Sequence, residues 1–510
     1  EDGIGKWWEG YDPQDLYEQN HPRSMNSHDV GTIHSQWNWG NGAAQPTEAY
    51  KTKVYNRTID LINKYHPDLV YYDDTAVPFY PISNEGLEMT AHLYNKSLKD
   101  NNGNMRAVVM GKILNEEQKE CMLWDVERGV PDRPQPKYWQ TCTCLGQWHY
   151  DRGVYDRNEY KSAATVIKML VDVVSKNGNL LMSVPVRGDG SIDEKEVAIL
   201  KDIKAWMDIN GESIFGTRPW TVFGEGPNAE SSNPLNNQGF NEGVNYVAED
   251  IRYVKKGDVV YVTALGWGAN NVMVLKNLSS VSPYYHSKIS KVELLGYGEV
   301  SYVCDKDGLM VKLPTVRPNP IAPVLKVSFG GTATLTDLHQ LKEVVVTDLD
   351  LAKQNIGNNT GQYENEYVNA LDDAYQASKV SEGASTEEIA AVYLQLKKAY
   401  ADFMLYGANK CVVLKGDEQA DDVTAEYLVE ASNFSRSDEG VVSTSRFGLL
   451  GEPWVVTSNI INQDNFTTGG FDSYNSSKCI GVQKWYNTDP AIENGKIYQV
   501  TTLPAGNYNF

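Results

Sequence analysis

The segment His66-Pro67-Asp68-Leu69-Val70-Tyr71-Tyr72-Asp73-Asp74 contains a short apolar and aromatic run that stops at two carboxylates. Leu69 to Tyr72 has the length and composition of a buried strand in a parallel sheet. In open α/β sheets and (β/α) barrels, catalytic side chains follow the carboxyl ends of such strands, which makes Asp73 a candidate functional residue. Taken alone, a strand that ends in Asp is more often explained by a solvated or helix-capping carboxylate.

Strands and helices alternate on both sides of this segment. Residues 47–65 have the apolar spacing of a helix, with Thr47 as its N-cap. Downstream, the same reasoning predicts helices at 84–100, 159–176 and 193–210, and strands at 106–110, 121–126 and 179–185. This alternation is typical of a parallel sheet or a (β/α) barrel, which we expect to occupy residues 1–220.

The pattern changes after residue 220. Short alternating runs separated by Gly, Asn and Pro predict a β-sandwich over residues 221–335. Residues 336–408 have helical spacing and are expected to form a small helical module or spacer. Residues 409–510 return to short β-type runs and are expected to form a truncated accessory β-sandwich. The sequence therefore predicts a multidomain protein.

Composition narrows the class of ligand. The net charge of −21 argues against nucleic acid or an anionic membrane as a partner. No apolar run reaches 18 residues, so no membrane span is predicted. The six cysteines lack the pattern of a disulfide framework or a zinc site, and we expect neither a metal nor a cofactor. The first and last residues indicate a fragment of a longer protein.

Two carboxylates follow different predicted strands. Asp73 ends the first of them, and Glu127 lies in a Glu-Arg-Gly turn just beyond the strand at 121–126. In a parallel sheet both would point into one cleft, where a pair about 5–5.5 Å apart can act as nucleophile and acid/base of a retaining glycosidase. Asp125, Glu116 and Glu117 are rival positions for the second carboxylate.

Three segments carry a resemblance to a known family. Ser175–Gly190 together with Trp206–Trp220, Pro67–Asp73, and Trp139–Tyr150 are similar to segments of the α-L-fucosidases of glycoside hydrolase family 29. The likeness extends over residues 1–335. It implies that residues 1–220 are the C-terminal part of a (β/α)8 TIM-type barrel. That family has a His-His pair before its nucleophile strand, and no His-His occurs in this chain.

The resemblance assigns roles to individual residues. It implies Asp73 as the nucleophile and Glu127 as the general acid/base. It also implies a substrate-binding group, which comprises Trp148, Lys112, Tyr72 and His149. Lys112 stands where the family commonly has Arg, Gln140 where Glu is usual, and His149 where Gly is usual, so an altered subsite is expected.

The implied function is that of a retaining glycosidase that releases α-L-fucose from a fucosylated oligosaccharide or glycoprotein glycan. The tail modules resemble those of secreted gut-bacterial glycosidases, so a periplasmic or extracellular location is expected. We also expect an open sheet with Asp73 near its edge, and no release of fucose by residues 1–510 alone. Two alternatives stay open. One is a non-catalytic carbohydrate-binding or adhesin-like protein with a degenerate barrel, and the other is a retaining glycosidase for a different sugar.

Overall fold

The computed structural model describes residues 9–10, 45–73, 77–230, 235, 239–359, 361–381 and 383–408, and five short strands beyond residue 446. The chain divides into two compact units, Glu1–Thr334 and Leu335–Phe510. Asp74 and most of residues 1–44 lie outside the described residues, and so does most of the accessory module expected at 409–510.

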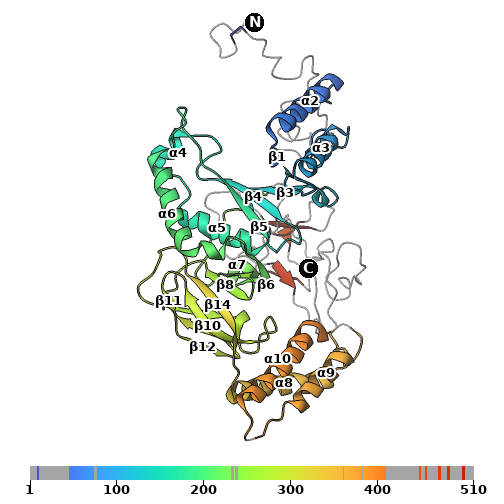
Figure 1. Ribbon diagram of the computed structural model, residues 1–510, viewed down its shortest axis with the longest axis vertical. Coiled ribbons are helices and arrows are strands. Elements are labelled where there is room, and N and C mark those ends of the chain that lie inside the picture. The colour runs from blue at the N-terminus through green and yellow to red at the C-terminus, as the bar shows by residue number, and fades with distance from the viewer. Residues whose placement is uncertain are drawn as a thin grey trace. The chain divides into compact units, whose positions relative to one another are not determined.

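The first unit contains a five-stranded parallel sheet in the order β1-β2-β3-β4-β5 (Figure 1). Its strands are β1 Leu69–Tyr72, β2 Val108–Gly111, β3 Leu123–Glu127, β4 Trp139–Cys144 and β5 Gly178–Ser183. All neighbouring strands are parallel, so their carboxyl ends share one edge of the sheet. Within the described residues β1 is an outer strand, which confirms the expected position of Asp73 near the sheet edge.

Helices alternate with these strands. They are α2 Glu48–Tyr65, α3 Glu85–Asp100, α4 Arg152–Arg157, α5 Ala163–Ser175 and α6 Glu194–Asn210. The side chains of Thr47, Ser162 and Asp193 each accept a hydrogen bond from a first-turn amide, as N-caps do. The predicted helices at 47–65, 84–100 and 193–210 are confirmed to within one residue at each end.

The two faces of the parallel sheet differ in chemistry. Val109 packs with Ile62 of α2 and Leu93 of α3, and Val126 packs with Val173 of α5. This face is therefore covered by helices. On the opposite face, Tyr71 donates a hydrogen bond to Asp125 at 2.8 Å, which places polar side chains there.

Residues 218–331 form two antiparallel sheets, called the β module below. The larger sheet has the order β11-β10-β14-β8-β7-β6 and the smaller has the order β12-β13-β9. The strands are β6 Arg218–Glu225, β7 Ile251–Lys256, β8 Val259–Ala264, β9 Val272–Leu275, β10 Lys288–Leu294, β11 Gly298–Glu299, β12 Tyr302–Asp305, β13 Gly308–Lys312 and β14 Val324–Gly331. Both sheets contribute to one buried cluster, for example through Val262 of β8 and Val311 of β13.

A buried charge cluster joins α5 to the β module. Asp172 of α5 lies between two cations, Lys176 just after α5 and Arg252 of β7. Lys176 Nζ is 2.9 Å from Asp172 Oδ2, and the hydroxyl of Tyr246 donates to the same oxygen at 3.0 Å. Burial would raise the pKa of Asp172, but Arg252 and Lys176 hold that pKa below its usual value. The carboxylate is therefore ionised inside the protein.

The second unit begins with three helices, α8 Leu335–Lys353, α9 Asn365–Ala377 and α10 Thr386–Asp402 (Figure 1). Each helix contributes a fully buried leucine, namely Leu338, Leu371 and Leu396. Ser385 and Glu388 form a capping box that fixes the start of α10. The later strands are β15 Phe447–Gly448, β16 Trp454–Val456, β17 Gly469–Asp472, β18 Cys479–Val482 and β19 Ile497–Gln499.

The described part of the chain has neither a helix suited to span a membrane nor a group of side chains suited to bind a metal. None of its helices combines the length and the apolar character that crossing a bilayer requires. The same residues contain no group of three or more His, Cys, Asp or Glu side chains arranged to hold a metal ion.

Candidate active site

Three of the predicted site residues meet at the carboxyl edge of the parallel sheet. Lys112, just after β2, donates from Nζ to Asp73 Oδ1 at 2.7 Å and to Glu127 Oε2 at 2.9 Å. Asp73 follows β1 and Glu127 ends β3, so one ammonium bridges the strands on either side of its own. The structure therefore brings together three of the four residues expected to converge at this edge, the fourth being Trp148.

The shared ammonium limits the distance between the two carboxylates. Because both oxygens contact the same nitrogen, they lie no more than about 5.6 Å apart. This limit is below the separation of about 6.5–9.5 Å that inverting glycosidases need to leave room for a water molecule.

The two carboxylates differ in exposure. The Asp73 side chain is 71% exposed, whereas that of Glu127 is 16% exposed. The Asp73 carboxylate is therefore open to solvent, whereas Glu127 is largely enclosed by its neighbours.

Lys112 is held as a cation despite its burial. Burial would lower the pKa of Lys112, but its hydrogen bonds to Asp73 and Glu127 raise that pKa above its ordinary value. A protonated Lys112 stabilises two negative charges that would otherwise repel each other. This bridging role was not predicted from the sequence, which suggested only a contact with substrate.

Asp125 lies two residues before Glu127 in β3, so both side chains are on the same face of the sheet. The Asp125 residue is buried, with 1% of its surface exposed. It accepts hydrogen bonds from Tyr71 at 2.8 Å, from Gln140 Nε2 at 2.7 Å and from Cys142 Sγ at 3.2 Å. Burial raises the pKa of Asp125 despite these donors. Its oxygens are occupied by buried neighbours, so Asp125 is less suited than Glu127 to protonate a substrate. Gln140, at the altered position noted in the sequence, belongs to this buried layer.

The other predicted substrate-binding residues lie in a loop and in the helix-covered core. Trp148 and His149 are exposed in the loop after β4. Tyr72 packs beside Val109 and Leu93 in the helix-covered core. Adjacent strand residues point to opposite faces, so Tyr72 lies across the sheet from Asp73 and not beside the carboxylates. Tyr71 is the tyrosine that shares the face of Asp73.

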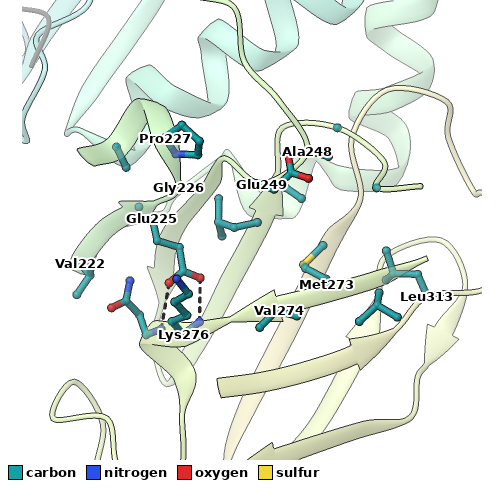
Figure 2. A pocket seen from close by; sticks show the side chains of 18 residues that line it. Val222, Glu225, Gly226, Pro227, Ala248, Glu249, Met273, Val274, Lys276 and Leu313 are labelled. Carbon is teal, nitrogen blue, oxygen red and sulfur yellow. Dashed lines mark hydrogen bonds between the residues drawn. The ribbon is translucent and has the colours of Figure 1, made fainter. Parts of the chain in front are cut away.

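A cavity lies in a part of the first unit that does not include Asp73, Lys112 or Glu127. Figure 2 shows it in the β module, with a volume of about 700 Å³ and walls that include Val222, Glu225 and Lys276. The Glu225 carboxylate accepts from the backbone amides of Lys276 and Asn277, each at 3.1 Å, and from the hydroxyl of Tyr253 at 2.7 Å. These contacts satisfy the carboxylate within the module, so the cavity offers no second reactive pair.

Two segments of the chain match domains of known families. Residues 13–212 match the family Alpha-L-fucosidase, and residues 244–328 match the Alpha-L-fucosidase C-terminal domain. In both segments the chain is similar to α-L-fucosidases. The first match contains Asp73, Lys112 and Glu127 together with the five-stranded parallel sheet. Residues 430–510 match a Domain of unknown function (DUF5013).

Individual α-L-fucosidases resemble the chain at low identity. The tissue α-L-fucosidase of Mus musculus is 27% identical over 302 residues, which cover 57% of this chain and 57% of that protein. The Homo sapiens tissue enzyme is 26% identical over 298 residues, covering 56% and 54%. The chain spans about half the length of the curated relatives it matches.

Solved structures give similar coverage. The α-fucosidase of Thermotoga maritima has 20% identity and a TM-score of 0.40, with 55% of this chain and 57% of that chain covered. The α-L-fucosidase isoenzyme 1 from Paenibacillus thiaminolyticus has 20% identity and a TM-score of 0.41, with 63% and 66% covered.

Proposed function

We propose that the natural polypeptide carrying this sequence is a retaining α-L-fucosidase, with Asp73 as nucleophile and Glu127 as general acid/base. The observation that carries the proposal is the bridge through Lys112, which keeps the two carboxylate oxygens closer together than an inverting pair requires. The match to the α-L-fucosidase family supports fucose as the sugar. We further propose that the parallel sheet is the C-terminal part of a (β/α)8 barrel.

The reaction has two displacement steps. Asp73 attacks the anomeric carbon of an α-L-fucoside and forms a glycosyl ester, while the bond to the leaving oxygen breaks and Glu127 gives its proton to that oxygen. Glu127 then removes a proton from water, which attacks the same carbon and releases fucose and the Asp73 carboxylate. Glu127 must carry a proton in the first step, so the Lys112 ammonium has to leave it when substrate enters.

The substrate and location follow from the same proposal. A fucosylated oligosaccharide or glycoprotein glycan would present the terminal sugar to the exposed Asp73 carboxylate. We propose a periplasmic or extracellular location, where such glycans are met. The net charge of −21 suits a neutral glycan better than a polyanion.

Product stereochemistry tests the mechanism. Proton NMR of aryl α-L-fucoside hydrolysis should show α-L-fucose as the first product, with the β anomer appearing only as the sugar mutarotates. The assay uses both the natural polypeptide and the purified 510-residue chain. Initial release of β-L-fucose would exclude the retaining mechanism. Fucose binding without turnover in both samples would favour the carbohydrate-binding alternative.

Replacing Lys112 by methionine should lower activity strongly. Loss of the ammonium leaves Asp73 and Glu127 without the shared donor that holds their oxygens in place. A displacement of about 1 Å at a catalytic group costs about 10²-fold in rate, so kcat/KM for an aryl α-L-fucoside should fall by about that factor.

Lys112→Arg is the matched control for this prediction. A guanidinium can also bridge two carboxylates, so the arginine variant should keep kcat/KM near that of the wild type. An unchanged kcat/KM in Lys112→Met would show that the bridge does not position the pair.

A further inference from the structure

A segment of the β module runs beside the turn that carries Glu127. This segment, Gly239–Glu242, comes from the connection between β6 and β7, and Gly239 pairs in parallel with Glu127. The amide of Phe240 donates to the Glu127 carbonyl at 2.8 Å, and the amide of Glu242 donates to the Arg128 carbonyl at 3.1 Å. The segment therefore extends the parallel sheet locally at the end of β3.

Asn241 adds a side-chain clamp on the same turn. Its Oδ1 accepts from the Val130 amide at 2.9 Å, and its Nδ2 donates to the Val130 carbonyl at 3.1 Å. Both backbone hydrogen-bonding groups of Val130 are thus held by one amide side chain. Together with the two backbone bonds, these contacts fix the chain on both sides of Arg128.

The Glu242 carboxylate anchors the segment to β3 and β4. It accepts from Arg128 Nε at 2.6 Å, from Thr143 Oγ1 at 2.5 Å and from Lys161 Nζ at 3.2 Å. Burial would raise the pKa of Glu242, but these partners hold that pKa below its usual value. The ion pair also ties the Arg128 side chain to Glu242. Arg128 has a φ of 47°, which lies in the left-handed region.

 This backbone conformation is uncommon outside glycine, so the surrounding contacts have to hold it in place.

Two glycines allow this close approach. Gly239 has a φ of 115°, and a Cβ added there would lie 2.0 Å from the Glu127 carbonyl oxygen. A Cβ on Gly129 would lie 2.6 Å from Asn241 Oδ1. Any larger residue at Gly239 would therefore have to push the two backbones apart, and the Glu127 turn would move with them.

We propose that Gly239–Glu242 is a positioning segment, through which the β module fixes where the Glu127 carboxyl group lies when it acts as general acid/base. The inference rests on the proposed function, because it assigns Glu127 the proton transfer to the leaving group. A displacement of about 1 Å at a catalytic group can cost about 10²-fold in rate. The segment itself touches no reacting atom, so its effect passes through the backbone of Glu127.

The substitution Gly239→Ala tests this role, with Gly298→Ala as the matched control. Gly298 lies in the same β module with a similar φ of 112°, but a Cβ there would meet no atom within 4 Å. Both variants therefore carry the same backbone strain, and only Gly239→Ala clashes with the Glu127 carbonyl. If Gly239→Ala does not fold, Asn241→Ala removes the Val130 clamp without adding bulk.

The decisive measurement compares two fucosides that differ in leaving group. A poor leaving group needs protonation by Glu127, whereas an activated nitrophenolate departs without it. In Gly239→Ala, kcat/KM should fall about 10²-fold for methyl α-L-fucoside and less than about threefold for an activated nitrophenyl α-L-fucoside. Gly298→Ala should leave both values near wild type. Equal losses with both substrates, or no loss with either, would overturn the inference.

Amide hydrogen exchange gives a readout that needs no activity. The amides of Val130, Phe240 and Glu242 should exchange faster in Gly239→Ala than in wild type or in Gly298→Ala. Unchanged exchange would refute the positioning role. A wild-type polypeptide that hydrolyses neither fucoside would refute the proposed function instead, and exchange would still decide whether the segment holds the Glu127 turn.

Discussion

Replacing Asp73 by glycine should abolish the hydrolysis of aryl α-L-fucosides by the natural polypeptide. Asp73 would form the covalent bond to the anomeric carbon, and no other carboxylate of the described site is placed to substitute, since Asp125 is buried and Glu127 serves as acid. Removing a nucleophile from a hydrolase costs about 10⁴–10⁶-fold in kcat. The measurement is the initial rate of nitrophenol release, with azide added in parallel to look for a fucosyl azide product.

Asp60→Ala on α2 is the matched control. Asp60 is also an exposed carboxylate paired with a lysine, with 59% of its side chain exposed, but it lies away from the sheet edge. Both substitutions should change the free energy of unfolding by no more than about 0.5 kcal/mol. Residual activity of more than a few per cent in Asp73→Gly, once contaminating enzyme is excluded, would remove Asp73 from the nucleophile role.

Replacing Asp172 by asparagine should destabilise the first unit strongly. Lys176 and Arg252 would lose their shared counter-charge inside the protein, and breaking a buried pair in this way costs about 3–5 kcal/mol. Calorimetry should show a lower transition temperature for the first unit, with the transition of the helical module in the second unit unchanged.

The pH dependence of this loss follows from the lowered pKa of Asp172. A carboxylate whose folded-state pKa is depressed stabilises the fold fully above its unfolded pKa, about 3.9, and loses that contribution as the pH falls through the folded-state pKa. The difference between wild type and Asp172→Asn should therefore be constant from pH 5 to 8 and shrink only in strong acid. Asp208→Asn, an exposed pair with Lys204, is the control and should cost little. A comparable loss in both variants would contradict the argument.

Periodicity predicted the secondary structure around the site well. The strand at 69–72 and its preceding helix follow from apolar spacing and from the Thr47 cap, and both are present. In the β module, the strands Val259–Ala264 and Val272–Leu275 likewise lie within the range where alternating runs predict β structure. These elements have strong local signals, because one face is apolar and turn residues border them.

The strand β4 shows where local signals fail. Its sequence, Trp-Gln-Thr-Cys-Thr-Cys, is polar by composition, yet all six residues are buried. Partners distant in sequence satisfy its polar groups, since Gln140 donates to Asp125, Thr141 to the Val126 carbonyl and Thr143 to Glu242. A hydropathy pattern cannot reveal such partners.

The candidate site was predictable only in part. Strand ends and family motifs were enough to select Asp73 and Glu127, whereas the choice of Tyr72 neglected the alternation that places Tyr71 beside Asp73. Glu242 could not be found, because it meets Arg128 across 114 positions of sequence and belongs to a different module. Contacts of that kind depend on tertiary packing and leave no local pattern.

The pairing of Gly239–Glu242 with the Glu127 turn has a consequence for how such proteins can recombine. A crossover placed at the module border near Arg218 would join a sheet from one relative to a β module from another. In such a hybrid, the Glu127 turn of one parent would lie against the 239–242 segment of the other at Gly129 and Gly239. A Cβ added at either glycine would lie 2.6 Å or less from an atom of the opposite segment. Residues 127–130 and 239–242 therefore have to be inherited as one unit, although more than a hundred residues separate them in the chain.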